Sequence, residues 1–140
     1  MSNPKIVDAI RNALTGHSSS ARDALIEQFH PDIVFEFTDS LPYGGTFKGV
    51  DGYKEFWDLV FVHWNKFDYD LHEIIDTGDR IIVPVIAHGE SKMGRSMWNE
   101  HLFFFKVENG KIVYGRIYAD SAKGRDAIAP WRTIADLTER

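Results

Sequence analysis

The amino-acid sequence predicts an α+β fold in which a curved antiparallel sheet packs against N-terminal helices and encloses an apolar pocket. Three observations support this class. Apolar residues recur at helical spacing near the N-terminus, the period changes to two after residue 32, and aromatic residues, 14% of the chain, occur in every expected element. A chain of 140 residues can bury a substantial core, so we expect a single domain over residues 1–140.

Three helices are expected in the first half of the chain. Asn3 and Pro4 suit the cap and first turn of a helix that ends at Gly16. Ser20 begins a second helix that ends before His30-Pro31, and Asp51 caps a third. The apolar stripes of these helices are Ile6, Val7, Ile10 and Leu14; Ala21, Leu25 and Phe29; and Phe56, Trp57, Val60, Phe61 and Trp64.

The remaining segments are expected to be strands and turns. Apolar residues alternate from residue 32 with Ile33, Phe35 and Phe37 on one side, and a turn-rich loop follows over residues 41–45. Four further strands are predicted over residues 66–77, 80–90, 95–107 and 111–120. Asn109-Gly110 is a strong hairpin signal, and Pro130 is expected to begin a short closing helix through Trp131, Ile134 and Leu137.

The run from Leu102 to Phe105 places two apolar residues on each face of its strand. Both faces of the sheet must therefore be covered there. Helices can cover one face, and a second copy of the chain is the simplest cover for the other. We therefore expect a homodimer formed through the sheet.

Composition argues against several classes of partner. The net charge is −5 and no basic block occurs, which argues against a nucleic-acid partner. The longest apolar run, residues 81–87, is too short to span a membrane, and the first residues show no apolar leader, so we expect no membrane association. The lack of cysteine is easiest to reconcile with a reducing compartment, which favours the cytoplasm.

Recognisable cofactor and metal motifs are also missing. The six histidines show no spacing typical of metal ligands, so no metal site is expected. No dinucleotide-binding or phosphate-binding glycine motif is present, and we expect no cofactor.

Three segments resemble the nuclear-transport-factor-two-like superfamily, and within it the SnoaL-like polyketide cyclase and ketosteroid isomerase-related branch. They are residues 45–53, the turn at residues 109–112 and the segment at residues 116–120. The resemblance covers nearly the whole chain in order and length. It implies a cone-shaped, cystatin-like α+β barrel whose members include cyclases, isomerases, dehydratases and binding modules, so the fold alone does not select a chemistry.

Asp120 is the first candidate for chemistry. Arg116, Tyr118 and Asp120 are two residues apart on one strand and share a face, and Asp120 resembles the acid/base Asp of SnoaL-like cyclases. The alternative is that Asp120 caps the C-terminal segment or pairs with Arg116.

His101 and Glu100 have opposite parity, so only one of them can face the pocket, and the resemblance favours His101. A histidine there can act as an acid or base, or it can be a core histidine bonded to a backbone carbonyl. His88 is expected to join His101 and Asp120 in an arrangement that resembles aromatic-polyketide dehydratases.

Tyr43 is expected at the pocket mouth, where its hydroxyl can hold a substrate carbonyl or only anchor the loop. The expected ligand-binding side chains are Trp57, Phe37, Tyr118, His88 and Trp98.

Two departures from relatives restrict the chemistry. Phe37 stands where the resemblance implies the catalytic Asp of ketosteroid isomerases, and Asp39 is only a displaced candidate. Val85 and Ala87 stand where epoxide hydrolases have an Arg and an Asp. Neither of those two mechanisms is favoured.

The leading hypothesis is a cofactor-independent enzyme that performs proton transfer on a small hydrophobic carbonyl compound, as isomerases, cyclases and dehydratases do. Asp120 is expected to be the base, with Tyr43 and His101 assisting. The alternative is a non-catalytic module of the same fold that binds a small ligand or serves as a dimeric scaffold.

Overall fold

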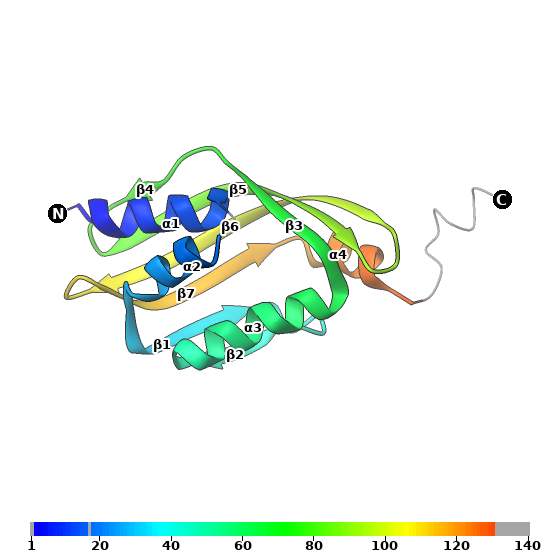
Figure 1. The fold of residues 1–140 in the computed structure, drawn as a ribbon, viewed down its shortest axis with the longest axis horizontal. Helices are drawn as coiled ribbons and strands as arrows, with labels where there is room; N and C mark the ends of the chain where they lie inside the picture. The colour runs from blue at the N-terminus through cyan, green and yellow to red at the C-terminus, as the bar shows by residue number, and fades with distance from the viewer. Residues whose placement is uncertain (1, 17, 131–140) are drawn as a thin grey trace.

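The computed structural model describes residues 2–16 and 18–130. Within these residues, three N-terminal helices lie over one face of a curved sheet and a fourth follows the last strand (Figure 1). The helices are α1 (Pro4–Gly16), α2 (Ser19–Ile26), α3 (Gly49–His63) and α4 (Ser121–Ile128). The strands are β1 (Phe29–Phe37), β2 (Gly45–Lys48), β3 (Trp64–Leu71), β4 (Ile75–Asp76), β5 (Arg80–Ser91), β6 (Ser96–Glu108) and β7 (Lys111–Ala119).

The sheet has the strand order β2-β1-β7-β6-β5-β3, and the short β4 pairs with β5. The predicted α+β class with a curved sheet is confirmed. One pair differs from the prediction, because β1 runs parallel to β7 while the other neighbours are antiparallel. The reason is that β1 and β7 are not joined by a hairpin. Residues 38–110 separate them along the chain, so a tight turn does not fix their relative direction.

The β6–β7 hairpin is formed as the sequence predicts. Asn109 has φ of 50° and Gly110 has φ of 74°, and positive φ at both positions is what a tight hairpin turn requires. This hairpin brings the end of β7 beside His101, which pairs with Ala119.

The core lies on the concave face of the sheet. Alternate residues of β6 are buried on this face, from Met97 to Phe105, and Phe56 of α3 belongs to the same core cluster. α3 contacts β1 and β2, and α1 contacts β3, so the helices cover the concave face from both edges (Figure 1). This arrangement places the even-numbered residues of β6 on the opposite, convex face.

Element boundaries differ from the prediction at four places. Phe29 is the first residue of β1 and Trp64 the first of β3, where the sequence suggested helix, because each pairs with a neighbouring strand. Residues 45–48 form β2, where the sequence suggested only a loop, since they pair with the end of β1. The segment predicted as a strand over 66–77 is divided between β3 and β4.

The end of the described chain contains a helix that was not predicted. α4 begins after Asp120, whose side chain accepts a hydrogen bond from the Ala122 amide. The predicted closing helix through Trp131, Ile134 and Leu137 lies outside the described residues.

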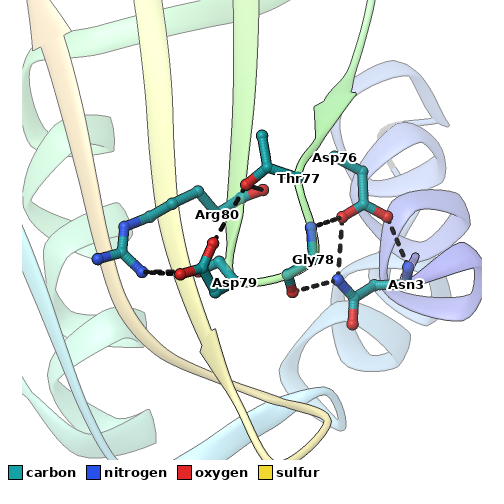
Figure 2. A network of polar contacts seen from close by, with 6 residues as sticks. All are labelled: Asn3, Asp76, Thr77, Gly78, Asp79 and Arg80. Carbon is teal, nitrogen blue, oxygen red and sulfur yellow. Dashed lines mark hydrogen bonds and ion pairs between the residues drawn. The ribbon is translucent and has the colours of Figure 1, made fainter. Parts of the chain in front are cut away.

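The start of α1 is fixed to the turn between β4 and β5 (Figure 2). The Asn3 amide and side chain donate to the carboxylate of Asp76, and the Asn3 side chain also donates to the Gly78 carbonyl at 2.7 Å. Desolvation alone would raise the pKa of Asp76, but the hydrogen bonds from Asn3 and Gly78 outweigh it and lower that pKa. The helix that closes one edge of the concave face is therefore held at its first turn.

None of the described helices has the length and apolar character needed to cross a membrane.

Candidate active site

A cavity of about 360 Å³ lies where α1, α2 and α3 meet β3. Aromatic rings form much of its wall, including those of Tyr53, Trp57, Phe67 and Tyr69, while Arg22 of α2 also lines it. Sites for small organic molecules in proteins have volumes of about 300–1,000 Å³ and mostly apolar walls. The size and composition of this cavity fit such a ligand.

A second, smaller cavity of about 10 Å³ lies deeper against the sheet. Its lining includes Phe37, Tyr43 and His101. Trp57, Phe67 and Tyr69 line both cavities, so these three rings lie between the larger space and the inner one. The inner cavity is about the size of one water molecule, and a larger ligand reaches it only if these rings move.

His101 is the histidine in the lining of the inner cavity. It is 7% exposed, and aromatic rings surround it, with Phe67 and Tyr69 each 6.0 Å away between ring centroids. Burial lowers the pKa of His101 to about 4, so the imidazole is neutral at pH 7. Its Nδ1 atom is buried and has no hydrogen-bond partner among the described residues. Because buried polar atoms almost always have a partner, this atom marks a position where a water molecule or a polar ligand atom can bind.

Asn99 lies two residues before His101 on the same face of β6 and is 2% exposed. Its Nδ2 donates to the backbone carbonyl of Asp120 at 3.0 Å, whereas its Oδ1 has no partner in the described part of the chain. The inner face of β6 thus carries two neighbouring polar side chains with unsatisfied atoms in an apolar environment.

Tyr43 is also buried beside the inner cavity. Its ring stacks on Phe37 at 5.5 Å, and its hydroxyl accepts a hydrogen bond from Trp64 Nε1 at 3.4 Å. Burial raises the pKa of Tyr43 to about 12, although the bond from Trp64 opposes this rise. The expected location at the pocket mouth is therefore wrong, because this ring is only 4% exposed. As the Trp64 group is the donor in that bond, the phenol keeps its own proton to donate.

A glycine on β5 allows Trp64 to reach Tyr43. A Cβ added at Gly89 would lie 2.5 Å from the Trp64 ring, so the indole lies directly over the backbone of this strand. The indole orientation that supports Tyr43 thus depends on the missing side chain at Gly89.

The structure does not place Asp120 in either cavity. Asp120 is exposed, and its carboxylate accepts from the Ala122 amide at 3.0 Å as the cap of α4. Arg116, from the same face of β7, lies 3.5 Å from Glu36 instead. Of the two possibilities for Asp120, the structural one, a helix cap, is observed.

Three predicted ligand-binding residues also lie outside the cavities. Trp98 and Tyr118 are 51% and 50% exposed, and His88 bonds to Asp70 at 2.7 Å. The reason is that successive side chains of a strand point to opposite faces of the sheet. His101 on β6 and Ile117 on β7 point inward, so the residues next to them in each strand point to the convex face. The placement of these three residues in the pocket is therefore wrong.

The structure does bring together four of the predicted residues. Phe37, Tyr43 and His101 line the inner cavity, and Trp57 borders both cavities. His101, and not the exposed Glu100, faces the interior. Asp39 is exposed.

The sequence interpretation missed Arg22, Asn99, Phe67 and Tyr69. Asn99 is two residues from His101 on the same strand, and this spacing could have indicated that both side chains point to the same face. Phe67 and Tyr69 also share a face of their strand, but nothing in the pattern showed that this face is the concave one.

The described side chains that commonly bind metal ions are not clustered. Within residues 2–16 and 18–130, no three His, Asp or Glu side chains gather in a way that could hold a metal ion.

Comparisons with known proteins place this geometry in context. Residues 7–115 match the model of the SnoaL-like domain family. No curated protein matches the sequence.

Solved structures share the fold over most of the chain. An NTF2-like protein of unknown function from Burkholderia pseudomallei is 25% identical, with a TM-score of 0.81, over 92% of this chain and 99% of that one. A putative SnoaL-like polyketide cyclase from Jannaschia is 15% identical, with a TM-score of 0.76, over 92% of this chain and 94% of that one. TerC, co-crystallized with polyporic acid, is 21% identical, with a TM-score of 0.78, over 89% of this chain and 98% of that one.

Proposed function

Because the chain belongs to the SnoaL-like domain family, we propose that it binds a small hydrophobic carbonyl compound in its cavities and that His101 performs proton transfer on that compound without a cofactor. The observation that carries the proposal is the buried, unpartnered Nδ1 atom of His101 beside an aromatic cavity. An unsatisfied buried atom costs free energy that a bound polar group would recover.

The imidazole is in the unprotonated form that a base requires. With a pKa of about 4, His101 at pH 7 can accept a proton at one ring nitrogen and donate from the other. In the proposed step, His101 removes a proton from the carbon beside the ligand carbonyl and returns it to another atom of the same molecule. The electron pair of the broken C–H bond forms an enolate, whose oxygen accepts a hydrogen bond from the Tyr43 hydroxyl.

In this proposal the base is His101 and not Asp120. Its exposed carboxylate is engaged with the first turn of α4, whereas His101 is enclosed with Tyr43 in one cavity. The neighbours support a small organic ligand only in general terms, since one is described as a putative polyketide cyclase and another was crystallized with polyporic acid.

Hydrogen exchange tests both binding and chemistry. We expect the protein to catalyse the exchange of hydrogen for deuterium from D₂O at the carbon beside the carbonyl of 1-tetralone. Proton NMR measures this exchange as loss of the signal of that hydrogen. His101→Phe should abolish this exchange, and Tyr43→Phe should slow it by about 100-fold, as loss of one enolate-stabilising donor typically does. His72→Gln, at an exposed histidine, is the matched control and should leave the rate unchanged.

The alternative, a non-catalytic binding module, gives a different result. In that case 1-tetralone binds to the wild-type protein, as measured by calorimetry, but exchange proceeds at the rate of buffer alone.

We also propose that a second copy of the chain covers the convex face of the sheet. The exposed rings of Trp98 and Tyr118 lie on this face with the half-buried Leu102 and Phe104. Sedimentation velocity should show a dimer that Phe104→Glu dissociates, while Phe61→Glu, at an exposed ring on α3, leaves it intact. A monomer at all concentrations would contradict this part of the proposal.

A further inference from the structure

The larger cavity carries a positive charge at its solvent side. Arg22 is exposed to solvent and also lines the cavity. Among the described residues of that lining, it is the only charged one. The whole chain has a net charge of −5, so the charge of Arg22, the one charged residue in the described lining, is opposite in sign to that of the chain as a whole. Such a charge near apolar walls attracts an anion more strongly than a cation in open water does.

Arg22 has no ion-pair partner among the residues that the structure describes. Its charge also reaches the cavity wall: burial raises the pKa of Tyr53 to about 12, while a hydrogen bond from Trp57 and the charge of Arg22 oppose this rise. The guanidinium therefore acts on groups inside the cavity and is available to a ligand.

The remaining walls select the body of that ligand. Trp57, Phe61 and Phe67 contribute aromatic rings to the same cavity, and aromatic rings favour flat apolar partners through stacked or edge contacts. His101 lies beyond Trp57 and Phe67, at the inner end.

We propose that the ligand is an aromatic keto acid whose carboxylate pairs with Arg22 while its carbonyl points toward His101. This inference rests on the proposed function and deepens it, because it names the second polar group of the ligand. Two oxygens of a carboxylate or of a phosphate can match the planar fork of a guanidinium, but one cation balances only the single charge of the carboxylate.

The test uses two probes of the same shape and different charge, 2-naphthoate and 2-naphthamide, measured by calorimetry at pH 7. We expect the wild-type protein to bind 2-naphthoate about fivefold more tightly than 2-naphthamide, as a partly exposed ion pair contributes. Arg22→Gln should remove this difference in affinity by weakening only the binding of 2-naphthoate. Arg22→Lys should keep part of the difference. Added salt should weaken binding of the naphthoate and leave the naphthamide unchanged.

Arg11→Gln provides the matched control. Arg11 is exposed on α1 and pairs with Asp8 at 3.3 Å, so its loss changes the net charge equally without touching the cavity. Binding of both probes should stay as in the wild type.

Two results would overturn the inference alone: equal affinity for both probes in the wild-type protein, or the same loss of naphthoate binding in Arg11→Gln as in Arg22→Gln. If neither probe binds, the proposed binding function fails together with this inference.

Discussion

Tyr69 and His101 lie with their ring centroids 6.0 Å apart, and Tyr69 borders both cavities whereas His101 lines only the inner one. The phenol ring therefore stands between the space that a ligand can occupy and the histidine that we propose to act on it. Burial raises the pKa of Tyr69 well above its usual value, so it stays a neutral hydroxyl at that position. A ligand in the larger cavity reaches His101 only if it passes this ring.

Replacing His101 by Phe should separate stability from function. The change removes a buried polar atom without a partner and keeps a flat ring among aromatic neighbours, so we expect the thermal midpoint to stay the same or rise. Proton exchange on 1-tetralone should be lost in the same variant. Scanning calorimetry measures the first effect, and a clear fall of the midpoint would show that Nδ1 has a stabilising partner.

The pH dependence of stability should carry a signature of His101. Its folded pKa is about 4 and an unfolded histidine titrates near 6.5, so between these values the unfolded chain binds a proton that the folded chain does not. The free energy of unfolding should therefore fall as the pH falls from about 6.5 to about 4. A pKa shift of this size corresponds to a change of about 3 kcal/mol in the free energy of unfolding.

Urea denaturation of the wild type and His101→Phe over this range isolates the effect, because all other groups are common to both proteins. The wild type should lose stability relative to the variant as the pH falls. Parallel curves would mean that His101 is not buried as described.

Substitution of Asp120 should affect stability and not chemistry. Asn can also cap a helix, so Asp120→Asn should retain both the thermal midpoint and exchange activity, whereas Asp120→Ala should cost about 1 kcal/mol of stability. Equilibrium denaturation and the exchange assay together measure this. Loss of exchange in a folded Asp120→Asn protein would return the role of base to Asp120.

Loss of the Asp76 carboxylate should loosen α1. Its folded pKa is lowered, so its contribution to stability is present above the unfolded value of about 3.8 and is lost as the pH falls below it. Asp76→Asn should therefore lower the urea midpoint at pH 7, and the difference from the wild type should narrow below about pH 4.

Asp79→Asn, in the same turn, is the control for that change. Asp79 is exposed and pairs with Arg80, away from Asn3 (Figure 2), so its midpoint should shift little. Equal effects of the two variants would contradict the anchoring role of Asp76.

The sequence was sufficient to predict the main elements. The alternation of residues left the inward side chain of β6 open between Glu100 and His101, and only the family resemblance favoured His101, which is the buried one. The sequence did not show which face of β7 is concave, because both faces carry apolar residues. The inward face includes Gly115, where an added Cβ would lie 2.9 Å from the Phe35 ring and 3.1 Å from Phe105. Large rings from two neighbouring strands fill this space, so the inward position is occupied by a residue that gives no hydrophobic signal.

Arg22 shows a second limit of sequence reasoning. It lies among polar residues of a short helix, and only the packing of α2 beside α1 and α3 places it on a cavity. Asp120 had the opposite problem, since its motif resembles an active site while its contacts are those of a helix cap.

The most direct test of the central claim compares the affinities of 1-tetralone and tetralin, which has the same ring system without the carbonyl, for the wild-type protein and His101→Phe. If His101 binds the carbonyl, the preference for 1-tetralone over tetralin should be about fivefold greater in the wild type than in the variant. The same preference in both proteins would contradict the claim.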